Sequence, residues 1–224
     1  MNRRFFMLFA GALALASCTP APNAATLPPK PQVYEKGMVS AADPRAAEAG
    51  AAMLRQGGTA TDGAIATMLA LTVVEPQSSG IGGGGLYVAA NATGEVSTID
   101  GRETAPAAAH PKWFFKDGVL LKFSEAVPGG TSVGVPGNIA LAARAHGAHG
   151  RLPWAALFAP AIKLARDGFV ITPRLNRMLK TNARVAAFSA EGRALFFGAD
   201  GEPLPVGTLV KHPALADTLQ AIAD

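Results

Sequence analysis

The hydrophobic and polar positions of this chain of 224 residues predict helices around one pair of strands. A helix is expected to begin at Asp43-Pro44, a cap residue followed by a first-turn proline, and to end at Gly57-Gly58. Residues 61–74 are apolar nearly all round, which indicates a second helix buried between layers. A short strand is expected ahead of both, over residues 37–41. Helices that pack on a sheet fit this order.

The next pattern along the chain is that of a β-hairpin. Residues 86–91 and 95–100 form two strand-like segments, joined by Ala92-Thr93-Gly94. Proline and glycine signals then predict helices over residues 137–146, over 153–168, from 173 onwards and over 213–224. The last of these reaches the final residue without a cap, which is how a fragment is expected to end.

The N-terminal residues have the pattern of an export signal. Two arginines precede an apolar run from Phe5 to Ala16, which is too short to span a bilayer, and small residues follow. Residues 1–17 are therefore expected to be an export signal. Leu15-Ala16-Ser17-Cys18 looks like a bacterial lipobox, which predicts lipidation of Cys18; an ordinary cleavable signal with an incidental cysteine is the alternative.

The residues after this signal divide into a tether and a folded part. Residues 18–35 are rich in proline and alanine, which predicts an extended segment. Residues 36–224 are expected to form one folded domain, since 49% of the chain is hydrophobic and only 16% is charged. Together these features predict a periplasmic lipoprotein anchored to the membrane.

Charge and ligand content argue against several classes of function. The formal net charge of +4 falls to +2 without residues 1–17, and the other basic residues are scattered, so nucleic-acid binding loses its support. Cys18 is the only cysteine, which excludes an internal disulfide and a thiolate metal cluster. His146 and His149 lack an acidic neighbour and are interpreted as residues at a helix end. We expect no metal and no cofactor.

Two glycine-containing motifs have the spacing of known functional motifs. Gly80, Gly82 and Gly85 match the dinucleotide fingerprint, with Asp100 at the distance of a ribose-binding acid. However, a helix is expected before these glycines and a strand after them, which reverses the order that the fingerprint requires. A tight crossing of backbone segments is the favoured interpretation.

The second motif is G-x-S-x-G around Ser132, followed by Asp200 and His212 in the chain order of α/β-hydrolases. Val135-Pro136-Gly137 delays the helix that should begin at the serine, and no strong apolar strand leads into it. A serine hydrolase therefore stays an alternative.

Arg102 follows the second expected strand, within a segment held by glycine and proline. A guanidinium can donate two parallel hydrogen bonds to a carboxylate, which suits a substrate acid. An ion pair with Asp100 or Glu103 is the competing interpretation, and the residue types alone do not separate the two.

Six separated stretches agree in order with one family. They are Gly37 to Ala41, Ala47 to Gly58 with Asp62, Val74 to Gly84, Asp100 to Pro106, Val135 to Gly137, and Leu164 to Phe169. From about residue 36 onwards, the chain resembles the N-terminal large-subunit portion of γ-glutamyltransferases, also called glutathione hydrolases. It departs from them at Thr59, where most members have asparagine, and at Gly63, where they have alanine.

This resemblance implies an α+β fold, the four-layer αββα sandwich of N-terminal-nucleophile hydrolases, here as an incomplete large-subunit fragment. It also implies a precursor that cuts itself into a large and a small subunit. The new N-terminal threonine of the small subunit attacks the γ-glutamyl amide of glutathione, with its own α-amine as the base. Arg102 stands where the family grips the α-carboxylate of the γ-glutamyl group. This chain is expected to contain no catalytic nucleophile.

Two further hypotheses stay open beside a truncated precursor. One is a lipoprotein that keeps the half-fold as a non-catalytic binding or scaffold module. Coding sequence beyond the codon for Asp224 would separate it from the first hypothesis. The other is a related amidase that acts on cephalosporin-type or poly-γ-glutamyl substrates.

Overall fold

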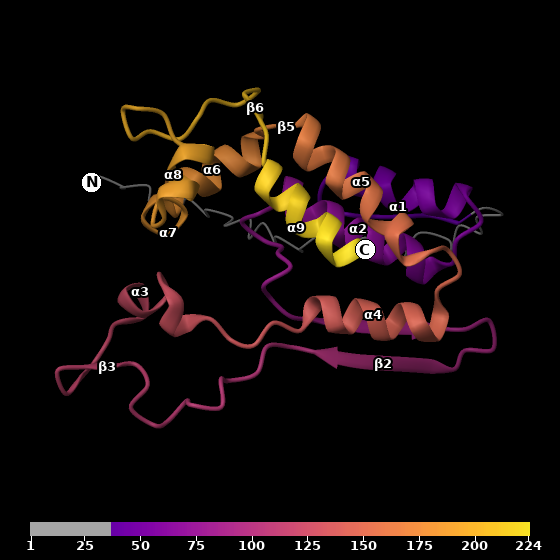
Figure 1. The fold of residues 1–224 in the computed structure, drawn as a ribbon, viewed down its shortest axis with the longest axis horizontal. Helices are drawn as coiled ribbons and strands as arrows, with labels where there is room; N and C mark the ends of the chain where they lie inside the picture. Colours follow the sequence, from indigo (N-terminus) through magenta and orange to yellow (C-terminus); the bar gives the residue numbers. More distant parts are fainter. Residues whose placement is uncertain (1–36) are drawn as a thin grey trace, which may run out of the picture. The chain divides into compact units, whose positions relative to one another are not determined.

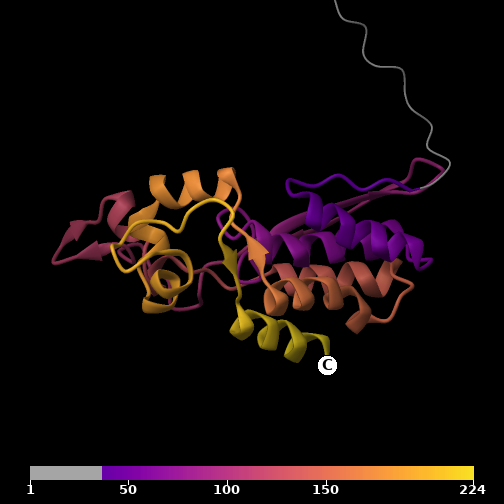
Figure 2. The ribbon, with the colours of Figure 1, turned by 90° about the horizontal axis from the view of Figure 1, so that it is seen from above.

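The computed structural model describes residues 37–224, and Figures 1 and 2 show its ribbon. The expected signal over 1–17, the tether over 18–35 and Cys18 lie outside the described residues. The helices are α1 (Pro44–Arg55), α2 (Ala60–Val74), α3 (Phe123–Ala126), α4 (Asn138–His149), α5 (Trp154–Asp167), α6 (Pro173–Thr181), α7 (Ala183–Ala186), α8 (Ala190–Phe196) and α9 (Pro213–Ala223), with a 3-10 turn, η1, at Gly130–Ser132. The strands are β1 (Gly85–Ala90), β2 (Val96–Gly101), β3 (Phe115–Lys116), β4 (Val119–Leu120), β5 (Phe169–Val170) and β6 (Leu209–Val210).

Helix α2 is the centre of the packed core. It contacts α1, α4 and α5, and α9 packs on the other side of α5 (Figure 2). Leu69 of α2 and Leu157 and Phe158 of α5 are fully buried, and each such side chain stabilises the fold by about 1.5–3 kcal/mol through the hydrophobic effect. The all-round burial of α2 that the sequence predicted is confirmed.

The helix starts follow local sequence signals. The Asp43 side chain accepts a hydrogen bond from the Arg45 amide at the start of α1, and the Thr172 hydroxyl accepts one from the Leu175 amide at the start of α6. Both α1 and α6 have proline in the first turn, where the backbone amide has no partner within the helix, so its absence does not destabilise the helix. The expected starts of these helices are confirmed.

The hairpin of β1 and β2 is the longest strand pairing in residues 37–224. Its register sets Tyr87 opposite Ile99, and Gly94 turns the chain with a φ of +83°. Helix α4 packs against both strands, as Figure 1 shows for β2. The combination of helices and antiparallel strands confirms the α+β class.

The strand expected over residues 37–41 is wrong. These residues form no strand, because no described segment pairs with them in a hydrogen-bonded ladder. In addition, α4 continues to His149 instead of ending at His146. No helix within residues 37–224 has both the length and the apolar character needed to cross a bilayer.

Candidate functional site

Three segments that are distant in sequence cross at the end of β2 and position Arg102. The amides of Gly137 and Asn138 both donate to the Gly83 carbonyl at 3.0 Å. The Asn138 side-chain amide donates to the Gly80 carbonyl at 2.7 Å, and the Val135 amide donates to the Thr104 carbonyl at 2.9 Å. The Val135–Thr104 bond holds the chain after Arg102, and the pairing of Gly101 with Gly85 holds the chain before it.

Glycine is required at this crossing because the backbones approach too closely for side chains. A Cβ atom at Gly84 would lie 2.5 Å from the Gly101 carbonyl oxygen, and one at Gly137 would lie 2.1 Å from the same atom. The expected tight crossing is confirmed. The loop also follows helix α2 and leads into strand β1, which is the reverse of a dinucleotide fingerprint.

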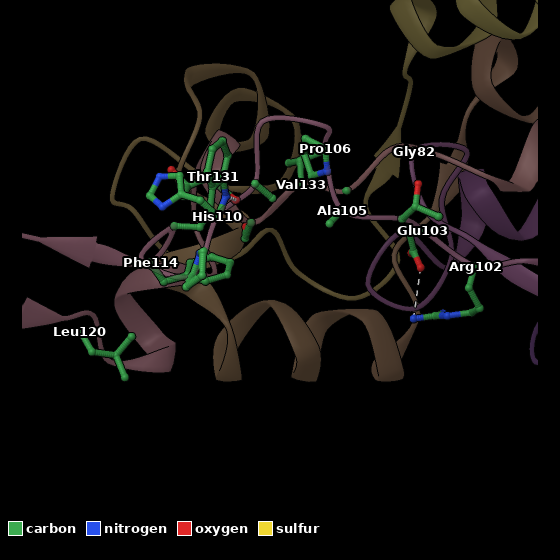
Figure 3. Close-up of a pocket in the computed structure, with 16 residues that line it drawn as sticks. Gly82, Arg102, Glu103, Ala105, Pro106, His110, Phe114, Leu120, Thr131 and Val133 are labelled. Carbon is green, nitrogen blue, oxygen red and sulfur yellow. Dashed lines mark hydrogen bonds and ion pairs between the residues drawn. The ribbon is translucent and has the colours of Figure 1, made fainter.

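Arg102 and Glu103 form an ion pair at this crossing. Nη2 of Arg102 lies 3.1 Å from Oε2 of Glu103 (Figure 3). Oε1 of Glu103 accepts the Gly84 amide hydrogen at 2.7 Å. The Arg102 side chain is 62% exposed, and its backbone amide donates to Asp100 at 2.9 Å. The glycine loop thus fixes Glu103, and Glu103 orients the guanidinium.

The charge on Glu103 is stabilised by its surroundings. Hydrogen bonds from its own backbone amide and from the Gly84 amide lower the pKa of Glu103, and the charge of Arg102 adds to the effect. Glu103 is therefore ionised at neutral pH. The sequence left two interpretations of Arg102, and the structure contains one of them, the ion pair with Glu103. This ion pair uses only the Nη2 atom, and the Arg102 side chain stays largely exposed.

A groove of about 700 Å³ lies beside this pair. In Figure 3 Arg102 and Glu103 lie at one end of the labelled residues, and Leu120 lies at the other. The remaining lining residues come from the glycine loop before β1, from the segment between β2 and β3, and from η1 and the loop after it: Gly82, Thr104, Ala105, Pro106, Ala109, His110, Pro111, Trp113, Phe114, Thr131, Ser132, Val133 and Gly134. The groove thus offers a cation at one end and aromatic surface at the other.

The residues of the serine-hydrolase alternative do not assemble. The Ser132 hydroxyl lies in η1 and donates to the carbonyls of Val127, at 2.6 Å, and Gly129, at 3.3 Å. His212 caps α9 instead, where its Nδ1 accepts the Leu215 amide hydrogen at 3.3 Å and burial lowers its pKa. Ser132 therefore has no histidine base among its hydrogen-bond partners.

His146 and His149 make contacts within the fold. Nε2 of His146 lies 2.8 Å from the Leu152 carbonyl oxygen and 3.7 Å from Oδ1 of Asp62, and the His149 ring stacks on Tyr87. Within residues 37–224 no three His, Cys, Asp or Glu side chains come together as a metal site would require.

Sequence reasoning missed two residues that build the site. Glu103 was considered only as a rival partner of Arg102, although it links the guanidinium to the glycine loop. Asn138 was not considered, although its buried side chain ties the start of α4 to Gly80. No local signal identifies it, because Gly137 is the N-cap of α4 and the Asn138 side chain bonds a residue 58 positions earlier.

Comparisons with known proteins agree with this architecture. Residues 46–224 match the family model described as Gamma-glutamyltranspeptidase. Glutathione hydrolase 3 of Arabidopsis thaliana is 42% identical over 191 residues, 85% of this chain and 29% of that protein. Glutathione hydrolase 5 proenzyme of Homo sapiens is 39% identical over 198 residues, 86% of this chain and 33% of that protein. The chain spans about a third of the length of these curated relatives.

Solved structures give the same result. Gamma-glutamyltranspeptidase of Helicobacter pylori superposes with a TM-score of 0.80 at 32% identity, over 86% of this chain and 55% of that chain. Cephalosporin acylase of Bacillus halodurans superposes with a TM-score of 0.69 at 31% identity, over 92% of this chain and 39% of that chain. By sequence and by fold, the chain belongs to the gamma-glutamyltranspeptidase family.

Proposed function

We propose that this chain supplies the α-carboxylate-binding part of an enzyme that transfers γ-glutamyl groups and hydrolyses glutathione and other γ-glutamyl amides. The observation that carries the proposal is the exposed Arg102 guanidinium, held at a groove through a single contact with Glu103. Its other nitrogens can donate parallel hydrogen bonds to the carboxylate of a γ-glutamyl donor. The names of the similar proteins support this substrate class.

The proposed attacking group is a threonine at the N-terminus of a small subunit cut from the same precursor. Its hydroxyl adds to the γ-carbonyl, the amide nitrogen leaves with a proton, and water or an amino acid then takes the acyl group from the threonyl ester. The word proenzyme in the name of the human relative supports a precursor. Within residues 37–224 Ser132, the other candidate nucleophile, donates its proton to carbonyls.

Replacement of Arg102 by alanine tests the binding role in a precursor that carries this chain together with its small subunit. We expect the KM for γ-glutamyl-p-nitroanilide to rise about 10- to 100-fold, the effect of losing hydrogen bonds to a charged group. The matched control is Arg55→Ala, which removes an arginine that is paired with Glu48 and equally exposed. An unchanged KM for Arg102→Ala would refute the assignment.

The chain alone provides a second test of the proposal. Purified chain should not hydrolyse γ-glutamyl-p-nitroanilide, and turnover that survives repurification would contradict the location of the nucleophile in a small subunit.

The superposition on cephalosporin acylase supports a related amidase as the second candidate function. For such an amidase, Arg102→Ala should leave the KM of a substrate without an α-carboxylate unchanged. Lipidation of Cys18 and a periplasmic location remain proposals from the sequence.

A further inference from the structure

The hairpin of β3 and β4 is a small element with an unusual surface. Asp117 and Gly118 join its strands, with φ angles of +52° and +80°, as in the two-residue turns that match strand twist. The register pairs Phe115 with Leu120 and Lys116 with Val119. Because paired residues share a face, Phe115 and Leu120 lie on one side of the hairpin and Val119 lies on the other.

Large apolar side chains are exposed on both of these sides. Phe115 is 41% exposed, Val119 69% and Leu120 61%, and Phe123, at the start of α3, is 85% exposed. A hairpin that packs on a protein core normally buries one face and presents polar residues on the other. Within residues 37–224 the side chains on both faces of this hairpin are exposed, although Phe115 is covered over slightly more than half of its surface.

Lysines surround these apolar side chains. Lys112, Lys116 and Lys122 are all exposed, and none forms an ion pair with an acid of the described part of the chain. Asp117 is the only acid within residues 112–123; the next, Glu125, accepts a hydrogen bond from the backbone amide of Lys122 at 3.0 Å. The segment therefore combines apolar side chains on its strands and at Phe123 with a net positive charge.

We propose that residues 112–123 bind the surface of an anionic phospholipid bilayer. Phe115, Val119, Leu120 and Phe123 enter the boundary between head groups and acyl chains, and the three lysines meet the phosphates. Apolar groups exposed on both sides of the hairpin suit an element that lipid surrounds. Protein interfaces are also depleted in lysine, which makes a protein the less suitable occupant.

An indole at position 123 provides a local test in the full chain. Phe123→Trp is compared with Val206→Trp, which places an indole at another exposed apolar site, where Lys211 is the one lysine within ten residues in the sequence. Each variant is mixed with vesicles of equal parts phosphatidylcholine and brominated phosphatidylglycerol. We expect the emission added by Phe123→Trp to fall by about half or more, because apolar groups of surface elements sit ~5–10 Å into the interface. Emission added by Val206→Trp should not change.

The charge requirement is tested by combining Phe123→Trp with Lys112→Gln, Lys116→Gln and Lys122→Gln. We expect the vesicle concentration at half-maximal quenching to rise about a hundredfold, from the loss of three lysine contacts with an anionic surface. Vesicles of brominated phosphatidylcholine alone contain the quencher but have no net charge, and they should give little quenching with Phe123→Trp, with or without the three lysine replacements. Since the signal is local, attachment through the N-terminal residues leaves position 123 unquenched, and that result would overturn the proposal. So would equal quenching at positions 123 and 206, or a shift to a protein dimer that shields the hairpin.

Discussion

Replacement of Asp62 by alanine should destabilise the fold more than replacement of an exposed carboxylate, because this side chain joins the start of α2 to the loop between α4 and α5. Its side chain is fully buried at the start of α2. Oδ2 accepts the amide hydrogens of Thr59 at 2.7 Å, Arg151 at 3.0 Å and Leu152 at 3.3 Å. The last two amides belong to the loop between α4 and α5, so Asp62 both caps a helix and anchors a distant loop.

The magnitude follows from these partners. Alanine would leave three amides without their ionised acceptor, and a hydrogen bond to a charged group contributes about 1.5–3 kcal/mol. The three contributions are not additive, because the loop can relax once one bond is lost. We expect a loss of about 3–5 kcal/mol in the free energy of unfolding. Asp62→Asn keeps one acceptor oxygen and should lose about 2 kcal/mol.

Urea unfolding followed by circular dichroism measures this loss. With a slope of about 2 kcal/mol per molar urea, Asp62→Ala should lower the midpoint by about 2 M. Glu48→Ala is the matched control, since it removes an exposed carboxylate paired with Arg55 and should change stability by less than about 0.5 kcal/mol. Equal midpoints for Asp62→Ala and Glu48→Ala would refute the reasoning.

Two further predictions concern the stability of the glycine crossing and the loss of stability at acidic pH. Gly84→Ala should lower the free energy of unfolding by about 1–3 kcal/mol in the same urea assay, because the new Cβ atom would collide with backbone atoms. Gly82→Ala is the control and should lower it less, because a Cβ atom there meets open space. Equal losses for the two variants would contradict the tight crossing. Burial alone would raise the pKa of Asp43, but hydrogen bonds from Arg45 outweigh it and lower the pKa below 3.8. The unfolded state then binds more protons, so this stabilisation is complete above pH 3.8 and is lost as the pH falls towards the folded pKa. Asp43→Asn should reduce the pH dependence of the urea midpoint there, and an unaltered dependence would exclude this role.

Local signals in the sequence predicted the elements that depend on neighbouring residues. Asp43-Pro44 and Thr172-Pro173 start helices, and Gly168, with a φ of +103°, follows the end of α5. These predictions held because caps, prolines and glycines act within one turn of the chain. The resemblance to the family rested on motifs of the same local kind, and the comparisons confirmed it.

The expectations that failed, or stayed open, depended on distant partners. A strand over residues 37–41 needs a neighbouring segment, and none of the described residues supplies one. Ser132 has the spacing of a nucleophile, but the chain turns its hydroxyl towards the Val127 carbonyl. The ion pair of Arg102 depends on the position of Glu103, which the Gly84 amide fixes across the crossing, and the substrate-binding role of Arg102 stays a proposal.

The Asp62 side chain makes one contact that the local sequence determines and others that only the tertiary structure determines. The sequence by itself determines that it lies three residues after Thr59, so the two form a capping box wherever a helix begins there. Only the tertiary structure decides that the same carboxylate accepts the amides of Arg151 and Leu152, 89 and 90 residues later. A cap is set by bond geometry over a few residues, whereas contacts over such separations exist only after α2, α4 and α5 have packed together.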